Sequence, residues 1–96
     1  MKAGTETSAK RFIDLIPTDE IKEALRNEFR RRVIRYKMID ESMKKKYGMT
    51  FTDFESLNIV EKRNFSWEVE SDAMEWEHAV EGVEYAIKRL KDIGEA

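Results

Sequence analysis

The sequence contains no cysteine, one proline, four glycines and one histidine among its 96 residues. Without cysteine the chain forms no disulfide and offers no thiolate to a metal or a catalytic site, so a reducing cytoplasm is the compartment that we expect. The start MKAGTETSAK lacks the apolar core of a signal peptide, and no apolar run approaches the length of a membrane span. We therefore predict a soluble cytoplasmic protein that does not bind membranes.

The sequence patterns of common enzyme sites are also missing. There is no Gly-rich phosphate loop, no Ser/His/Asp set and no zinc-ligand spacing. We therefore predict that the chain is not an enzyme and binds no cofactor.

Charged residues, in contrast, make up 40% of the chain, against an ordinary share of about 25%. The net charge of −2 argues against a protein whose whole surface binds nucleic acid. Nine basic and three acidic residues fall between Arg26 and Lys46, a net charge of +6, whereas three basic and nine acidic residues fall between Ser66 and Ala96, a net charge of −6. We expect these two segments to pair with each other.

The first half of the chain predicts one long helix. Residues 1–9 are small and polar, and we expect a flexible N-terminus there, ahead of a single helical domain over 10–96. Residues 10–16 contain Phe12, Ile13, Leu15 and Ile16 and predict a short helix that ends at Pro17. Thr18 then resembles an N-cap, and nothing interrupts the helical pattern before Gly48, which predicts a helix of about 28 residues, roughly 42 Å long.

The second half predicts a connector and a second long helix. Thr52 and Glu55 fit a capping box, which predicts a short helix in the connector. From Trp67 to Ile93, apolar residues recur at alternating spacings of four and three, as in a coiled coil. We call this set the seam: Val69, Ala73, Trp76, Val80, Val83, Ile87 and Leu90.

These elements predict an all-α fold. Two long helices of similar length fold back antiparallel, with short N-terminal and connecting helices. Because a two-helix hairpin buries little apolar surface, we expect two copies to form a dimeric four-helix bundle around the seam.

The stretch EWEHAV, residues 75–80, holds the single histidine. Glu75, His78 and Glu81 share one side of the predicted helix, and Glu-x-x-His is a ligand pair of di-iron helix bundles. Such a site needs two of these pairs and two further glutamates in the core, so we favour a solvated, salt-bridging edge. Two ExxE pairs suggest magnesium-dependent nucleotide hydrolysis as a weaker alternative: Glu20 with Glu23, and Glu81 with Glu84.

The stretch RNEFRRRVIRYK, residues 26–37, is the strongest nucleic-acid candidate. Its arginines could bind RNA phosphates while its aromatic side chains stack on bases. We favour the alternative that these residues pair with the acidic helix. The RNA-contact candidates are Arg26, Arg30, Arg31 and Arg35.

KYGMTFTDF, residues 46–54, and WEVESDAMEWEHAVEG, residues 67–82, carry a resemblance to a known group. The chain resembles small, mostly archaeal helical proteins with a KYGM(S/T)FxxF segment followed by a DxxxWExxV helix. Such proteins are commonly encoded beside small RNase-type toxins and are regarded as antitoxin-like. The resemblance covers about the last two-thirds of the chain and implies structural roles for Tyr47, Gly48, Phe51, Phe54 and Trp76, with no catalytic residue.

We therefore predict a non-catalytic helical module that binds a protein partner, such as a small toxin. An RNA-binding helix over Arg26–Lys37 and a metal-binding or magnesium-dependent nucleotide-hydrolysing bundle stay open as alternatives.

Overall fold

The computed structural model describes residues 15–94, and all the regular structure in this range is helical. The helices are α2 (Thr18–Tyr47), α3 (Phe51–Ser56), α4 (Ile59–Lys62) and α5 (Trp67–Asp92). The predicted flexible segment 1–9 and most of the predicted short helix over 10–16 lie outside the described residues. The prediction of an all-α fold is confirmed for the described part of the chain.

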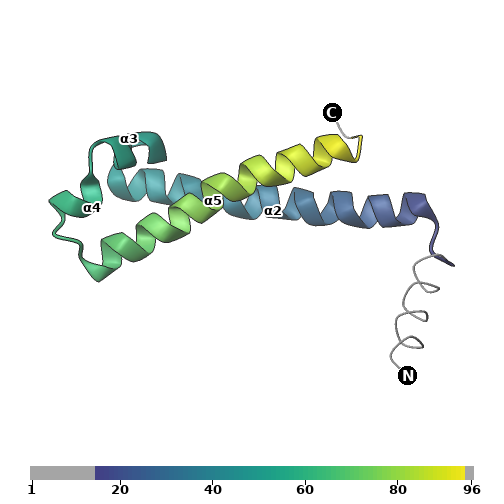
Figure 1. Ribbon diagram of the computed structural model, residues 1–96, viewed down its shortest axis with the longest axis horizontal. Helices are drawn as coiled ribbons and strands as arrows, with labels where there is room; N and C mark the ends of the chain where they lie inside the picture. Colours follow the sequence, from purple (N-terminus) through teal and green to yellow (C-terminus); the bar gives the residue numbers. More distant parts are fainter. Residues whose placement is uncertain (1–14, 95–96) are drawn as a thin grey trace, which may run out of the picture.

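The two long helices, α2 and α5, form an antiparallel hairpin. They run side by side in opposite directions and cross near the middle of the molecule, while α3 and α4 lie at the end where the chain reverses (Figure 1). We call this end the closed end, and the end where α2 begins and α5 finishes the open end. Along its shortest axis the molecule measures 17 Å, compared with about 10–12 Å for a single helix with its side chains.

The ends of the helices follow from local hydrogen bonds. Gly48 adopts a left-handed φ of 67° and its N–H donates to the Lys44 carbonyl, which ends α2 as predicted. The predicted cap at Thr18 is wrong, because Thr18 is already helical and follows Pro17 without a side-chain cap. The predicted capping box of Thr52 and Glu55 is also wrong, because the N-cap of α3 is Thr50, two residues earlier. The Thr50 hydroxyl accepts a hydrogen bond from the Asp53 N–H at 3.2 Å.

The main core lies at the closed end. Met43, Phe54, Val69 and Trp76 are buried there, and the Trp76 side chain has no exposed surface. The rings of Tyr47, Phe51 and Phe54 pack around the Trp76 indole with centroids between 5.0 and 5.8 Å away. This core explains why the short helices α3 and α4 stay folded against the hairpin.

A polar network connects the two long helices at the same end. Lys46 forms ion pairs with Glu68 at 2.8 Å and Asp72 at 2.6 Å, and the Tyr47 hydroxyl donates to Asp72. The Trp76 Nε1–H donates to the Asp40 carboxylate at 2.8 Å. Burial, together with the hydrogen bond to Asp72, raises the pKa of Tyr47 to about 12. The pKa of the Asp72 carboxyl is lowered, because the hydrogen bonds from Lys46 and Tyr47 outweigh the opposing effect of its burial.

Within residues 15–94, the expected pairing of the basic helix with the acidic helix occurs at this network. Between described residues, the ion pairs that join α2 to α5 all involve Lys46. Arg31 and Arg32 both pair with Glu28 inside α2 instead. Short contacts within a helix satisfy these side chains without a second helix, since residues three or four apart are neighbours.

Candidate functional site

The seam is buried at its beginning and half-exposed towards its end. Val69 and Trp76 are buried, whereas Ile87 remains 37% exposed. The other members are half-buried: Ala73, Val80, Val83 and Leu90. The seam therefore contributes to the core of one chain mainly in the first half of α5.

In the second half of α5, a face of small residues packs against α2 in place of the seam. Ala79 and Ala86 are completely buried, and Gly82 lies between them at helical spacing. The Tyr36 ring of α2 packs so closely on Gly82 that a Cβ atom there would lie 2.5 Å from Tyr36 Cε2. Because the helices cross, α5 presents this face to α2 beyond Trp76. The spacing of Ala79, Gly82 and Ala86 was visible in the sequence, but the stronger pattern of the large seam residues concealed it.

His78 is exposed and contacts Tyr36 rather than a set of carboxylates. The two rings meet edge to face with centroids 5.4 Å apart, and His78 Nε2 lies 3.4 Å from the Tyr36 hydroxyl. Glu75 and Glu81 are exposed as predicted, and within residues 15–94 neither forms an ion pair with His78. No three His, Asp or Glu side chains in the described part are grouped to hold a metal ion.

The glutamate pairs of the magnesium alternative lie apart from each other. Glu23 pairs with Arg26 in the first turns of α2, at the open end. Glu81 and Glu84 are exposed on α5. The geometry therefore does not assemble these carboxylates into one site.

The four RNA-contact candidates do not share one face of α2. Arg26 and Arg30 are four residues apart and lie on one side, as do Arg31 and Arg35 on another, and Arg30 and Arg35 are separated by about 140° around the helix. The Arg35 guanidinium lies 5.7 Å from the Tyr36 ring centroid and Arg31 pairs with Glu28. The four arginines therefore form two pairs on different sides of α2 rather than one continuous cationic face.

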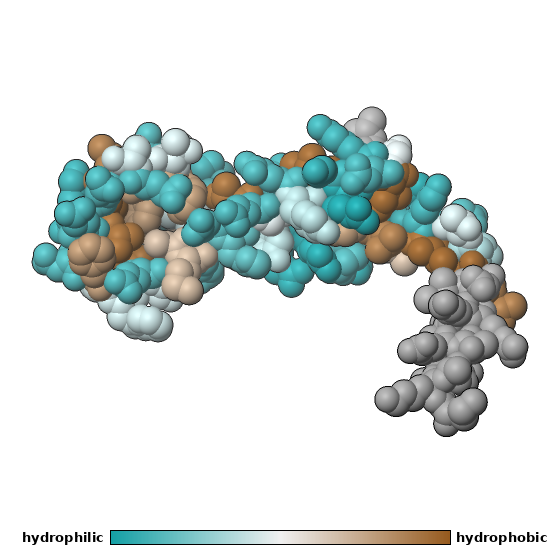
Figure 2. All heavy atoms as spheres, viewed as in Figure 1, coloured by the Kyte–Doolittle hydropathy of each residue, from teal (hydrophilic) through white to brown (hydrophobic). Residues whose placement is uncertain are grey.

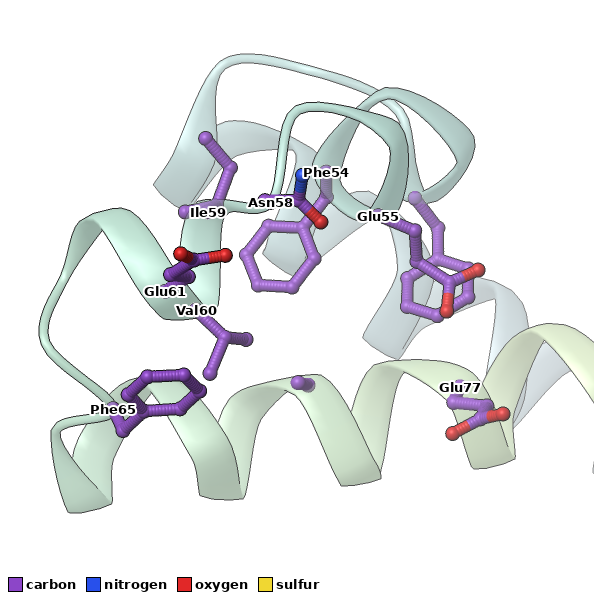
Figure 3. Close-up of a pocket in the computed structure, with 10 residues that line it drawn as sticks. Phe54, Glu55, Asn58, Ile59, Val60, Glu61, Phe65 and Glu77 are labelled. Carbon is purple, nitrogen blue, oxygen red and sulfur yellow. The ribbon is translucent and has the colours of Figure 1, made fainter.

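A hollow of about 260 Å³ lies at the closed end (Figure 3). We call it the α3–α5 hollow, because helices α3, α4 and α5 all contribute to it. Phe54 and Val60 point into it from α3 and α4, and Ala73 of α5 forms part of its wall. Figure 2 shows hydrophobic residues exposed among hydrophilic ones at this end of the molecule. The wall is therefore apolar and open to solvent.

The mouth of the α3–α5 hollow is acidic. It is lined by Glu55 of α3, Glu61 of α4 and Glu77 of α5, one carboxylate from each helix. In the part of the chain that the structure describes, none of these three side chains forms an ion pair. Sequence reasoning missed this site, because each glutamate belongs to a different helix and only the fold brings them together.

The backbone around α4 is held in an uncommon conformation. Asn58, Asn64 and Phe65 have positive φ angles of 52°, 58° and 52°. Asparagine tolerates this left-handed region, but a phenylalanine there is uncommon. The Phe65 ring is nevertheless 60% exposed at the edge of the hollow. The two asparagines were the sequence signal for these turns.

No family model, curated protein or solved structure matches this chain. The resemblance to the antitoxin-like group therefore stays a prediction. Over residues 15–94, no helix is both long enough and apolar enough to span a bilayer.

Proposed function

We propose that this chain is a non-catalytic helical protein that acts by binding other proteins, and that its first partner is a second copy of itself. The observation that carries this proposal is the half-exposed end of the seam. Ile87 is 37% exposed while its neighbour Ala86 is fully buried. The heptad spacing of the seam continues into the part of α5 where the hairpin does not bury the seam side chains. This is expected if another helix covers those side chains.

The small size of the core supports self-association. Seven hydrophobic side chains are buried within the described residues, and a small domain buries a smaller fraction of its surface on folding than a large one. The homodimer would cover Val80, Val83, Ile87 and Leu90 and form a four-helix bundle.

The outer face of α2 supports a second protein contact. Ile34 and Met38 are 62% and 68% exposed and lie one helical turn apart on α2. The same shallow surface is lined by four cationic side chains, Arg31, Arg35, Lys37 and Lys45, and by two acidic ones, Glu28 and Glu41. An apolar ridge with cationic neighbours suits the acidic, amphipathic helix of a partner. A small toxin is the partner that we propose, in keeping with the resemblance of residues 46–54 and 67–82.

Light scattering at micromolar concentration tests the self-association. We expect a species of twice the 11.4 kDa chain mass. Ile87→Glu should dissociate it, because the carboxylate would be buried without a partner at the interface. Lys88→Glu alters an exposed neighbouring residue by two charge units and should leave the dimer intact. A monomeric wild-type chain would refute the homodimer.

A pull-down with the tagged protein, repeated after nuclease treatment, separates the toxin partner from the RNA alternative. A stoichiometric small protein that survives nuclease, and that Ile34→Glu/Met38→Glu no longer captures, would support the proposal. Co-purifying RNA whose affinity falls steeply with salt would instead support RNA binding. The Lys88→Glu chain again serves as the control.

A further inference from the structure

We propose that the α3–α5 hollow receives residues 10–13 of a second copy of this chain. In this arrangement Phe12 and Ile13 enter the apolar hollow, and Lys10 and Arg11 lie against the carboxylates at its mouth. The inference rests on the self-association proposed above and assigns it a specific contact.

The size of the hollow fits side chains rather than a cofactor. Its volume of about 260 Å³ is below the roughly 300–1,000 Å³ of sites that bind drug-sized ligands. Phe54 and Val60 make its inner wall apolar, so an apolar side chain is the matching occupant. One or two such side chains would fill the space.

The charge at the mouth selects a basic segment. Glu55, Glu61 and Glu77 lie around its rim, and none has an ion pair among residues 15–94. The sequence KRFI, residues 10–13, places two cations directly before two large apolar residues. A segment of this kind matches both the wall and the mouth.

The hollow is beyond the reach of the same chain's residues 10–13. Asp40, which binds Trp76 next to the hollow, lies about 33 Å along α2 from Thr18. The five residue steps from Ile13 to Thr18 span at most about 18 Å. In two antiparallel copies, however, the start of α2 in one copy would lie beside the other copy's closed end, and the two contacts would be reciprocal.

The face of α5 continues from the hollow into the half-exposed seam. Ala73 and Glu77 line the hollow, and Val80, Glu84 and Ile87 follow at helical spacing on the same side of α5. A second copy that covers Ile87 therefore lies next to the hollow.

Phe65 supplies an aromatic edge to the hollow. Its backbone lies in the left-handed region at φ 52°, and its ring is 60% exposed. Strained backbone of this kind is concentrated at binding sites. A docked Phe12 or Ile13 would cover this ring.

Photo-cross-linking tests the contact directly. The full-length chain is made with p-benzoylphenylalanine in place of Phe65, and ¹⁴N-labelled and ¹⁵N-labelled copies are mixed before irradiation. We expect cross-linked peptides that contain residues 10–13 and join light to heavy chains. Cross-links within one chain or to another segment would overturn the inference. If light scattering shows a dimer and no such cross-link forms, the inference fails and self-association stands; if the chain is monomeric, both fail.

A charge exchange keeps the test specific. Arg11→Glu should lower the intermolecular cross-link yield roughly tenfold. Adding Glu61→Lys should restore most of the yield, whereas adding Glu75→Lys, an exposed site outside the hollow, should not. Equal restoration by both substitutions, or by neither, would overturn the assignment of Arg11 to the mouth.

Discussion

Replacing Gly82 with alanine should destabilise the protein, although alanine is the better helix former. Gly82 lies inside α5, where Gly→Ala ordinarily stabilises a helix by about 1 kcal/mol. The added Cβ would lie 2.5 Å from Tyr36 Cε2 and 2.6 Å from Cδ2. These distances are far below the roughly 3.5–4.0 Å of a favourable carbon contact, so the ring must move.

The size of the effect follows from what the Tyr36 ring loses. Tyr36 Cγ would lie 3.2 Å from the new methyl group, so the whole ring must swing away and its tip cannot adjust alone. Overpacking of this kind costs about 1–3 kcal/mol, and the edge-to-face contact with His78 contributes roughly 0.5–1.5 kcal/mol more. Against the helical gain of about 1 kcal/mol, we expect a net loss of about 0.5–3.5 kcal/mol.

Urea unfolding followed by circular dichroism, at one fixed protein concentration, measures this loss. The control is the same substitution in a Tyr36→Ala background, where the ring is absent. There Gly82→Ala should raise the free energy of unfolding by about 1 kcal/mol. The change in the free energy of unfolding caused by Gly82→Ala should therefore have opposite signs in the two backgrounds. An equal gain in both would refute the close packing of Tyr36 on Gly82.

Three further predictions concern the closed end. Trp76→Phe should lower the free energy of unfolding by about 1–3 kcal/mol, because the hydrogen bond to Asp40 is lost. Asp40→Asn retains an acceptor for the indole N–H and should lower it less. Chemical denaturation of the two variants compares these losses. The folded pKa of Tyr47, about 12, exceeds its unfolded value of about 10, so its contribution to stability is complete below pH 10 and is lost as the pH rises to 12. Denaturation at several pH values should show a shallower decline for Tyr47→Phe, and identical slopes would contradict the cause assigned. Phe65→Asn should raise the free energy of unfolding by up to about 1 kcal/mol by relieving the left-handed strain, while Phe65→Leu should give no gain.

Much of the fold could be predicted from the sequence because its signals are local. Pro17 and Gly48 bound α2, and the residues from Trp67 onward carry a period of 3.5 that only a helix satisfies. The position of Trp76 at the centre of the core followed from the same period. The cap of α3 was misplaced by two residues, because Thr50 and Thr52 both precede an acidic residue by three positions and local pattern does not decide between them.

The features that could not be predicted depend on how the helices cross. The crossing turns Ala79, Gly82 and Ala86 towards α2, and no periodicity of large apolar residues marks such a face. Charge complementarity also failed as a guide, because Arg31 and Arg32 reach Glu28 on their own helix more easily than they reach α5. The acidic mouth of the hollow depends in the same way on the arrangement of three helices.

The uneven distribution of contacts along the hairpin has a consequence for its motion. The aromatic core and the Lys46–Asp72 network both lie at the closed end, whereas towards the open end, among the described residues, Phe29 contacts Tyr85 and Arg89. Local opening should therefore begin where α5 finishes and proceed towards Trp76, so amide hydrogens near Leu90 should exchange with solvent much faster than those near Ala73. A hairpin that opens progressively from one end lets a partner insert between its helices while the closed end stays folded.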